Sequence, residues 1–471
     1  MAAKEMSPEQ VRELDDLFTR AAAAQKILET YDQERIDRLC QTVAWSVYNK
    51  KTWNHLSEMG IAEGGLGDPV SRLNKRGKIK GVLRDALRQK SVGIIEEDTV
   101  KGIAKYAKPV GIIGSLVPTT NPDLTPGGQA VYAIKARDAI IFSPHPRTVK
   151  TTIETVEIMR KALREEGAPE DILLCITLPS IPMTNALMSR CDLVIATGGK
   201  AMVHAAYSSG TPAYGSGAGN ATMIFDETAD VVEACHNAMI SKTSDNGSGC
   251  SADGNIVVHD SIYESVLKQL EVEGGYFADE KQREMLRKVM WDDEGHRLPD
   301  TVATSPQKLA EVAGFAIPSD RKFIFVLGDG IARDKMFCQE KLTTLLAVHM
   351  YEGEFENALD MMRAIYDIGG KGHSVGIYSF DDDHIHRLGL AAPVSRIMVR
   401  QPQSKANSGA ATNGMPMTSS MGCGTWGGNI VSENICLKHY MNTTWVSRPI
   451  PADMPSDIEI FGTFFDPEME A

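Results

Sequence analysis

Several features that would place this 471-residue chain in a broad class of protein are missing. It has no excess of basic residues, because 49 Lys and Arg stand against 62 Asp and Glu, giving a net charge of −13. A field of that sign repels phosphate backbones, so no nucleic-acid partner is expected. No run approaches the roughly 20 apolar residues that a membrane span requires. We therefore expect a soluble, cytoplasmic protein without a membrane partner.

Paired cysteines are also missing. The eight cysteines are scattered along the chain, and none belongs to a Cys-x-x-Cys pair. This distribution argues against a disulfide framework and against a structural zinc site. We expect reduced thiols, most of them small buried hydrophobic residues, and no metal.

The composition that is present is that of a globular protein, with 42% hydrophobic and 24% charged residues. The length exceeds what one hydrophobic core usually serves, so two large domains are predicted. The first hundred residues have helical periodicity, and the basic stretch 75–90 is interpreted as a solvated helix face.

From residue 109 the pattern changes to short apolar runs that alternate with helices. The first strand candidates are 110–117, 139–143, 172–178, 193–196 and 222–225. A second series begins near residue 243, with candidates at 255–258, 323–327, 375–378 and 396–399. Such alternation predicts parallel, doubly wound α/β sheets, which bind ligands at the carboxyl ends of their strands. The aperiodic stretch 403–428 is long enough to suggest a functional loop that lines the site.

Two residues are candidates for the chemistry. Cys250 lies on the glycine-rich segment Asn246-Gly247-Ser248-Gly249-Cys250, where little side-chain cover suits a nucleophilic thiol, although a packed core cysteine is about equally supported. Asn121 follows a buried strand, where its amide could stabilise an oxyanion. Taken alone, Asn121 is better read as a turn residue before proline.

Three glycine-rich segments give weaker signals. Thr197-Gly198-Gly199 has the strand–turn–helix arrangement that lets backbone amides approach a pyrophosphate. The segment 215–220 is equally well read as a plain loop. Cys423, between glycines and next to Thr425 and Trp426, is a rival nucleophile.

Eight segments, taken in order, resemble the coenzyme A-acylating branch of the aldehyde dehydrogenase superfamily, and the resemblance covers nearly the whole chain. The segments are 118–122, 143–147, 196–199, 206–210, 217–220, 245–247, 340–342 and 422–429. The resemblance implies an aldehyde dehydrogenase-like fold with two doubly wound α/β domains and an oligomerisation arm. It assigns residues 1–242 to cofactor binding, with an arm hairpin at about 93–108, residues 243–440 to catalysis, and 441–471 to a C-terminal arm. It also implies a homodimer or homotetramer.

The same resemblance makes Cys250 the nucleophile and gives the oxyanion hole to Asn121 and the backbone N–H of Cys250. Cys423, Thr425 and Trp426 become substrate-pocket residues. The cofactor is NADP or NAD, with His145 and Arg147 compatible with either. Its expected contacts are Pro118, Thr119, Ser143, His145, Pro146, Arg147, Thr197, Gly198, Gly199, Gly217 and Glu340, the last through a ribose hydroxyl.

The acceptor of the acyl group follows from a missing carboxylate. Hydrolytic relatives place a glutamate at the segment corresponding to Gly217-Ala218-Gly219-Asn220, which here has none, so coenzyme A is the expected co-substrate. A hydrolytic dehydrogenase giving the free acid and a non-catalytic scaffold are the alternatives. His373 matches the branch too, and we interpret it as a loop histidine bonded to backbone.

The residues around the cysteine, Gly249-Cys250-Ser251-Ala252-Asp253, are smaller and more polar than is usual in the branch. The most similar subfamilies act on short anionic aldehydes, and sulfoacetaldehyde is favoured over succinate semialdehyde. Such a substrate needs a charged anchor, for which Arg396 and Lys405 are the candidates, with Ser404, Ser408 and Thr418 nearby.

Overall fold

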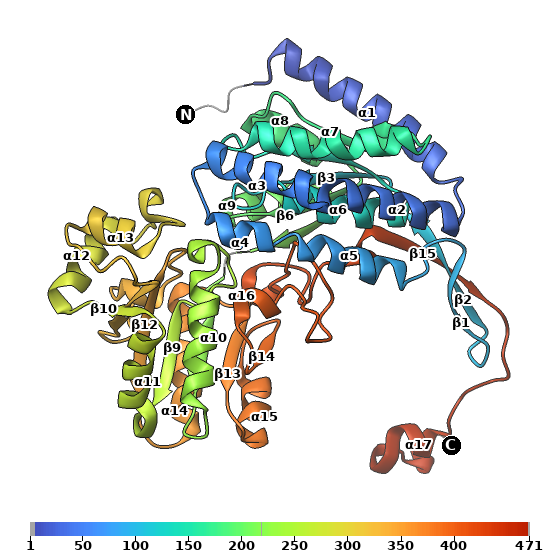
Figure 1. The fold of residues 1–471 in the computed structure, drawn as a ribbon. Coiled ribbons are helices and arrows are strands. Elements are labelled where there is room, and N and C mark those ends of the chain that lie inside the picture. Colours follow the sequence, from blue (N-terminus) through green and yellow to red (C-terminus); the bar gives the residue numbers. More distant parts are fainter. Residues whose placement is uncertain (1–4, 218, 470–471) are drawn as a thin grey trace.

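The computed structural model describes residues 5–217 and 219–469, which form two α/β lobes and a projecting arm (Figure 1). Helices of the amino-terminal segment cover the first lobe: α1 (Pro8–Leu28), α2 (Gln33–Tyr48), α3 (Lys50–Gly64), α4 (Pro69–Asn74) and α5 (Gly77–Leu87). The Ser7 hydroxyl accepts a hydrogen bond from the backbone N–H of Gln10, and the side-chain oxygen of Gln10 accepts one from the backbone N–H of Ser7. This capping box fixes where α1 begins.

The first lobe is built on a five-stranded parallel sheet of order β5-β4-β3-β6-β7. Its strands are β3 (Ile112–Leu116), β4 (Ala139–Ser143), β5 (Leu173–Cys175), β6 (Leu193–Thr197) and β7 (Ala213–Ser216). Its helices are α6 (Leu124–Ala136), α7 (Val149–Glu165), α8 (Ile181–Arg190) and α9 (Lys200–Tyr207). The chain leaves β3 in one direction to β4 and later returns to β6 on its other side. The crevice beyond β3 is therefore a topological switch point.

The second lobe has a seven-stranded parallel sheet of order β10-β11-β12-β9-β8-β13-β14. Its strands are β8 (Thr222–Phe225), β9 (Asn255–His259), β10 (Gly275–Phe277), β11 (Phe323–Leu327), β12 (Leu345–Tyr351), β13 (Val375–Tyr378) and β14 (Ile397–Val399). Its helices are α10 (Val231–Thr243), α11 (Asp260–Val272), α12 (Glu280–Met290), α13 (Pro306–Ala313), α14 (Phe355–Gly369), α15 (Asp382–Ala391) and α16 (Gln403–Ala406). The two parallel, doubly wound sheets confirm the predicted fold class.

The chain crosses between the lobes earlier than residue 242. Strand β8 precedes that position, yet it pairs with β9 and β13 inside the second sheet. The segment after β14 then returns to the first lobe, because Met417, Leu437 and Tyr440 are buried in its main hydrophobic core. A boundary drawn from sequence order thus differs from the boundary set by strand pairing.

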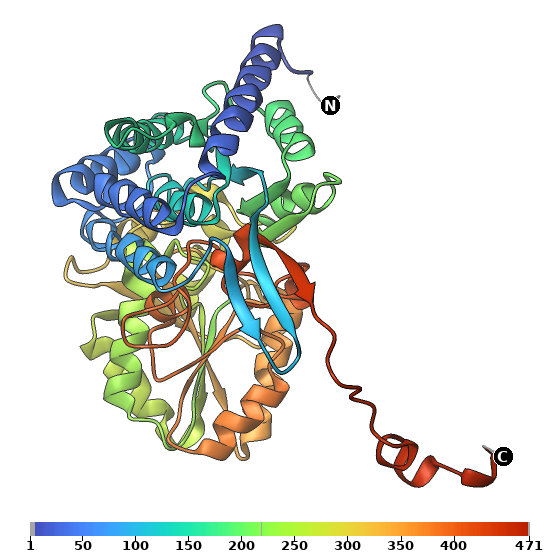
Figure 2. The same cartoon turned by 90° about the vertical axis from the view of Figure 1, so that its right-hand side faces the viewer.

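The arm is a three-stranded antiparallel sheet made from distant parts of the chain. Strands β1 (Ile94–Asp98) and β2 (Ile103–Pro109) form a hairpin, and β15 (Met441–Ser447) pairs along β2. Beyond β15 the tail extends away from both lobes and carries the short helix α17 (Asp457–Phe461) (Figure 2). Within the described ranges, no helix combines the length and apolarity needed to cross a membrane.

Candidate active site

Cys250 lies on a strained turn between α10 and β9. Asp245 and Asn246 adopt positive φ of 51° and 53°, and Gly247 follows at 66°. A Cβ on Gly247 would lie 2.5 Å from the Thr343 carbonyl oxygen, so only glycine fits there. Consecutive left-handed residues persist only where tertiary contacts hold them, and such strain concentrates at functional sites. The turn leaves Cys250 half-buried.

The Cys250 sulfur contacts a histidine from the segment between α14 and β13. His373 Nε2 lies 3.2 Å from Cys250 Sγ, and His373 Nδ1 lies 2.9 Å from Ser374 Oγ. Asn407 Nδ2 donates to the same hydroxyl at 2.8 Å. The reading of His373 as a backbone-bonded loop histidine is therefore wrong, because both ring nitrogens face side chains.

Both members of this pair are electrically neutral at rest. Burial raises the pKa of the Cys250 thiol to about 12, and the Glu340 carboxylate adds to the rise. Burial also lowers the pKa of His373 to about 3, and the Arg396 guanidinium acts in the same direction. The geometry, with His373 Nε2 3.2 Å from Cys250 Sγ, places the imidazole within hydrogen-bond reach of the thiol proton, while the lowered pKa of His373 weakens it as a base.

Asn121, from the segment after β3, is held by a buried charge network. Lys75 Nζ donates to Asn121 Oδ1 at 2.9 Å and to Asp245 Oδ2 at 2.5 Å. Asp245 also accepts the Asp68 amide N–H at 2.8 Å and lies 3.7 Å from Arg72 Nε. Because the amide oxygen faces Lys75, the Asn121 NH₂ group is left to donate: one N–H is bonded to Thr120 Oγ1 at 3.3 Å, and the group has a second donor. Asp245 belongs to the turn that carries Cys250, so this network ties Asn121 to the nucleophile.

Gly219 is packed directly against the backbone of Cys250. A Cβ at Gly219 would lie 1.9 Å from the Cys250 carbonyl oxygen, and the Gly219 N–H donates to Glu340 Oε1 at 2.9 Å. Glu340 thus lies beside the nucleophile. Gly217, two residues before Gly219, is packed against Cys423, whose sulfur would lie 3.7 Å from a Cβ at that position. Ala218 falls outside the described residues.

We expect Gly219→Ala to displace the Cys250 turn, because the methyl group cannot fit against backbone. Overpacking of this kind costs about 1–3 kcal/mol, and kcat should fall with the misplaced thiol. Thermal unfolding and steady-state kinetics would measure both effects. Gly389→Ala is the matched control, since no atom lies within 4 Å of a Cβ there. Wild-type kinetics in Gly219→Ala would contradict the tight packing.

Cys423 is a poor rival for the nucleophile. It is fully buried, its N–H donates to Asn429 Oδ1 at 2.8 Å, and burial raises its pKa. Thr425 and Trp426 follow on an exposed 3₁₀ turn, and Trp426 is 48% exposed. Exposure therefore separates the two thiols that the sequence left as rivals.

The residues predicted to contact the cofactor gather at the carboxyl edge of the first sheet. They follow or end four neighbouring strands: Pro118 and Thr119 after β3, Ser143, His145, Pro146 and Arg147 at β4, Thr197, Gly198 and Gly199 at β6, and Gly217 after β7. Gly199 is the N-cap of α9, with no atom within 4 Å of a Cβ. An open, glycine-lined helix start fits a pyrophosphate.

The polar side chains of this group have local partners. Ser143 Oγ is buried and lies 3.0 Å from Thr184 Oγ1, whereas Thr197 Oγ1 lies 2.7 Å from Ser420 Oγ. Arg147 is exposed and donates to the Gly64 carbonyl at 2.6 Å. Of these groups, Arg147 retains donors that face solvent.

Arg396 and Lys405 are placed differently from one another. Arg396 is buried and donates to Asn434 Oδ1 at 2.8 Å, to the His373 carbonyl at 3.0 Å and to the Gly422 carbonyl. This placement does not support a role as a substrate anchor, because every guanidinium nitrogen is bonded inside the protein. Lys405 is half-buried, and its ammonium group donates to Ser244 Oγ at 2.7 Å.

The basic stretch 75–90 is not a fully solvated face. Lys75 reaches the Asn121 network, and Lys78 Nζ donates to Gly409 O at 2.8 Å and to Ser408 Oγ. The interpretation as a solvated face is wrong for these two lysines. No local feature of the sequence indicates that these two lysines are bonded inside the protein. The partner Asn121 is more than 45 residues from Lys75, and the partner Gly409 is more than 300 residues from Lys78.

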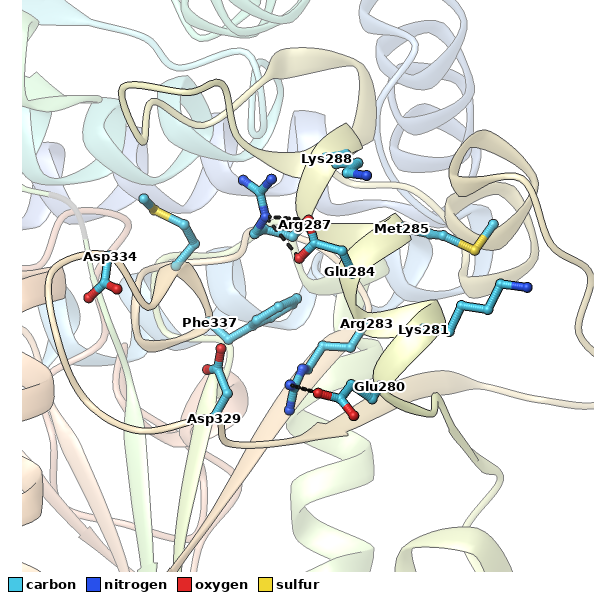
Figure 3. Close-up of a pocket in the computed structure, with 11 residues that line it drawn as sticks. Glu280, Lys281, Arg283, Glu284, Met285, Arg287, Lys288, Asp329, Asp334 and Phe337 are labelled. Carbon is cyan, nitrogen blue, oxygen red and sulfur yellow. Dashed lines mark hydrogen bonds and ion pairs between the residues drawn. The ribbon is translucent and has the colours of Figure 1, made fainter.

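A separate pocket lies between α12 and the loop before β12 (Figure 3). Two ion pairs lie among its charged side chains, Arg287 with Glu284 at 3.0 Å and Arg283 with Glu280 at 3.7 Å. None of the residues described above lines this pocket, so it stands apart from the candidate site.

Known proteins match both the sequence and the fold of this chain. A profile of the aldehyde dehydrogenase family matches residues 69–273. The chain is 42% identical over 450 residues to a sulfoacetaldehyde dehydrogenase of Acholeplasma sp, covering 94% of this chain and 93% of the relative. It is 39% identical over 451 residues to an acylating sulfoacetaldehyde dehydrogenase of Bilophila wadsworthia, with 94% and 97% covered. The crystal structure of an acetylating aldehyde dehydrogenase from Geobacillus thermoglucosidasius matches with a TM-score of 0.91 at 34% identity, over 95% of this chain and 99% of that one. The chain therefore belongs to the aldehyde dehydrogenase family, in its acylating branch.

Proposed function

We propose that this enzyme oxidises a short aldehyde with NADP⁺ or NAD⁺ and transfers the acyl group from Cys250 to coenzyme A. The observation that carries the proposal is the 3.2 Å contact between His373 Nε2 and Cys250 Sγ. A neutral imidazole at the nucleophile can take the proton of the Cys250 thiol and later that of an incoming thiol. The test is to follow nicotinamide reduction with a panel of aldehydes, with and without coenzyme A. Reduction indifferent to coenzyme A would favour the hydrolytic alternative, and no reduction would favour a scaffold.

The proposed reaction starts with proton transfer from Cys250 Sγ to His373 Nε2 as the sulfur attacks the aldehyde carbon. The new alkoxide accepts hydrogen bonds from the Asn121 amide and the Cys250 N–H, which stabilise its charge. Bound nicotinamide supplies a hydride acceptor, and the thiohemiacetal carbon becomes a thioester. Once His373 has released the first proton to solvent, the sulfur of coenzyme A attacks that carbon and His373 takes the proton of the coenzyme A thiol. Cys250 leaves as a thiolate and recovers this proton from His373, so that the net reaction releases one proton.

We assign the nicotinamide to the carboxyl edge of the first sheet. The helix start at Gly199 suits the pyrophosphate, and Glu340, which already bonds the Gly219 amide beside Cys250, suits a ribose hydroxyl. His145 and Arg147 border the adenosine end, where exposed Arg147 could serve a 2′-phosphate. Comparing kcat/KM for both nicotinamides in Arg147→Ala tests this last point.

Lys75 is proposed as a positioning residue for Asn121. Its bond to Asn121 Oδ1 fixes which end of the amide faces the substrate, and its bond to Asp245 anchors it. We expect Lys75→Met to lower kcat by roughly 10- to 100-fold, less than the 10²- to 10³-fold loss typical when an oxyanion donor is removed. KM for the nicotinamide should change little.

The control for this prediction is Lys80→Met, which removes an exposed lysine of the same region. Partial recovery of kcat in Lys75→Arg would distinguish positioning from folding, since arginine can also donate to the amide oxygen. An unaltered kcat in Lys75→Met would remove Lys75 from the mechanism.

Sulfoacetaldehyde is the proposed substrate, and succinate semialdehyde is the alternative. The names of the two relatives described above support a short sulfonated aldehyde. Lys405 remains a candidate anchor for the anionic tail, with Cys423, Thr425 and Trp426 proposed for the rest of the pocket. A comparison of kcat/KM values for the two aldehydes would decide between them.

We also propose that the arm joins copies of this chain into a homodimer or homotetramer. The tail beyond β15 exposes large apolar side chains, including Ile458, Phe461 and Phe464. Burial of such residues against a second copy would remove them from water. Sedimentation of the full chain and of a truncation after residue 447 tests this assignment.

A further inference from the structure

Three lysine side chains interact with one another at this site: Lys75 contacts Asn121, and Lys78 Nζ donates to the carbonyl of Lys405 at 3.4 Å. They come from the segment after α4, from the first turn of α5 and from α16, which meet at the junction of the two lobes (Figure 1). Lys75 bonds Asn121 and Asp245, Lys78 bonds the loop at Ser408 and Gly409, and Lys405 bonds Ser244. We call Lys75, Lys78 and Lys405 the lysine cluster.

The lysine cluster has more positive charge than nearby carboxylates compensate. Asp245 is bonded to Lys75 and is also close to Arg72. Among the residues that the structure describes, neither Lys78 nor Lys405 has a carboxylate within 4.0 Å. The three groups are half-buried, and burial together with Lys405 and Lys75 lowers the pKa of Lys78 to about 8. Burial and Lys75 also lower the pKa of Lys405, against the opposing charges of Asp245 and Asp68. Uncompensated like charges in a partly buried place are unfavourable, and a bound anion would relieve them.

We propose that the lysine cluster binds the sulfonate or carboxylate group of the aldehyde substrate and so determines specificity for anionic aldehydes. An ammonium group has three N–H donors, and Lys405 uses one of them, for Ser244. Lys405 therefore offers charge-assisted hydrogen bonds to an anionic oxygen, while Lys78 adds charge from beneath the loop. This inference rests on the proposed function and names the part of the site that selects the substrate.

The position of the lysine cluster favours the aldehyde over the other anionic ligands of the reaction. Lys75 Nζ lies 2.9 Å from Asn121 Oδ1, and Lys405 Nζ donates to Ser244, which precedes Asp245 in the turn that carries Cys250, so the cluster contacts both the proposed oxyanion donor and the segment of the nucleophile. In a short aldehyde the anionic group is separated from the reacting carbon by one or two carbons, which matches this closeness. The phosphates of coenzyme A are separated from its thiol by the whole pantetheine arm. A 2′-phosphate of NADP lies at the far end of the cofactor from the nicotinamide.

The test compares sulfoacetaldehyde with propionaldehyde, which has no charge, as substrates of Lys405→Met and Lys78→Met. In Lys405→Met we expect the ratio of kcat/KM for the two aldehydes to fall by roughly 10- to 100-fold, since a hydrogen bond to a charged group is worth about 1.5–3 kcal/mol. In Lys78→Met we expect a smaller fall of the same ratio, because the donors of Lys78 are already bonded to Lys405, Ser408 and Gly409 and only its charge is lost. Lys405→Arg should retain most of the preference, and Lys80→Met is the matched control on the exposed side of α5. A ratio within twofold of wild type in both methionine variants would overturn the proposal.

A second measurement does not depend on turnover. Titration calorimetry of 2-hydroxyethanesulfonate, a non-reacting analogue, should give weaker binding to Cys250→Ala/Lys405→Met than to Cys250→Ala. Equal binding would also overturn the proposal, as would a rise in KM for coenzyme A alone. Failure of the proposed function gives a different result: the wild-type enzyme would then reduce no nicotinamide in a coenzyme A-dependent way with any aldehyde.

Discussion

Replacing Cys250 with serine is expected to lower kcat by at least roughly 10⁴-fold, as is typical when the nucleophile of a covalent mechanism is removed. A serine side chain is only slightly smaller than cysteine and fits the same half-buried position. Its hydroxyl is, however, a far weaker nucleophile than a thiolate. His373 activates a serine hydroxyl less readily than the thiol, because the pKa of a serine hydroxyl lies well above that of the thiol. Steady-state nicotinamide reduction with aldehyde and coenzyme A measures the loss.

The matched control is Cys423→Ser, which changes the other thiol of the glycine-rich site. Because Cys423 is fully buried and bonded through its backbone to Asn429, we expect mainly a loss of stability. Its thermal unfolding temperature should fall while kcat/KM stays within about tenfold of wild type. The reverse pattern, with Cys250→Ser active and Cys423→Ser inactive, would assign the nucleophile to Cys423.

Replacing His373 with asparagine is the second large expected effect. The variant removes the group 3.2 Å from the sulfur, and loss of a general base typically costs about 10²- to 10⁴-fold in rate. Because burial raises the pKa of Cys250 to about 12, the thiol of the variant stays protonated at neutral pH. Raising the pH toward that value should recover part of the lost rate, since hydroxide then forms the thiolate.

The pH dependence of Cys250 alkylation isolates this effect from hydride and acyl transfer. With neutral iodoacetamide, the alkylation rate of both enzymes should still be rising above the usual thiol pKa near 9. The wild-type enzyme should react faster at neutral pH. Ser374→Ala is the accompanying variant, because it removes the hydroxyl at His373 Nδ1 and should give a smaller loss. A His373→Asn variant with wild-type kcat and alkylation would eliminate His373 as the base.

Much of the fold follows from patterns that are local in the sequence. The short apolar runs that predict strands correspond to β3, β4, β5, β6, β8, β9, β11, β13 and β14, and the alternation with helices predicts their parallel pairing. Cys250 and Asn121 could be proposed because their neighbours in sequence, glycines and a strand end, define their surroundings.

The partners of these residues could not be predicted in the same way. His373 is 123 residues from Cys250, and Lys75 is 170 residues from Asp245. The periodicity of apolar residues indicates whether a segment has a buried face. It does not indicate which distant side chains pack against that face or bond to it. Arg396 illustrates the same limit, since a charged residue expected to meet substrate is buried against three internal acceptors.

The central claim is that an acyl group rests on Cys250 before coenzyme A removes it. The most direct measurement is mass spectrometry of enzyme quenched after mixing with aldehyde and oxidised nicotinamide in the absence of coenzyme A. The mass of the peptide containing Cys250 should increase by one acyl group, and coenzyme A added before quenching should abolish the increase. An acyl group found on the peptide containing Cys423, or on neither peptide during active turnover, would contradict the account.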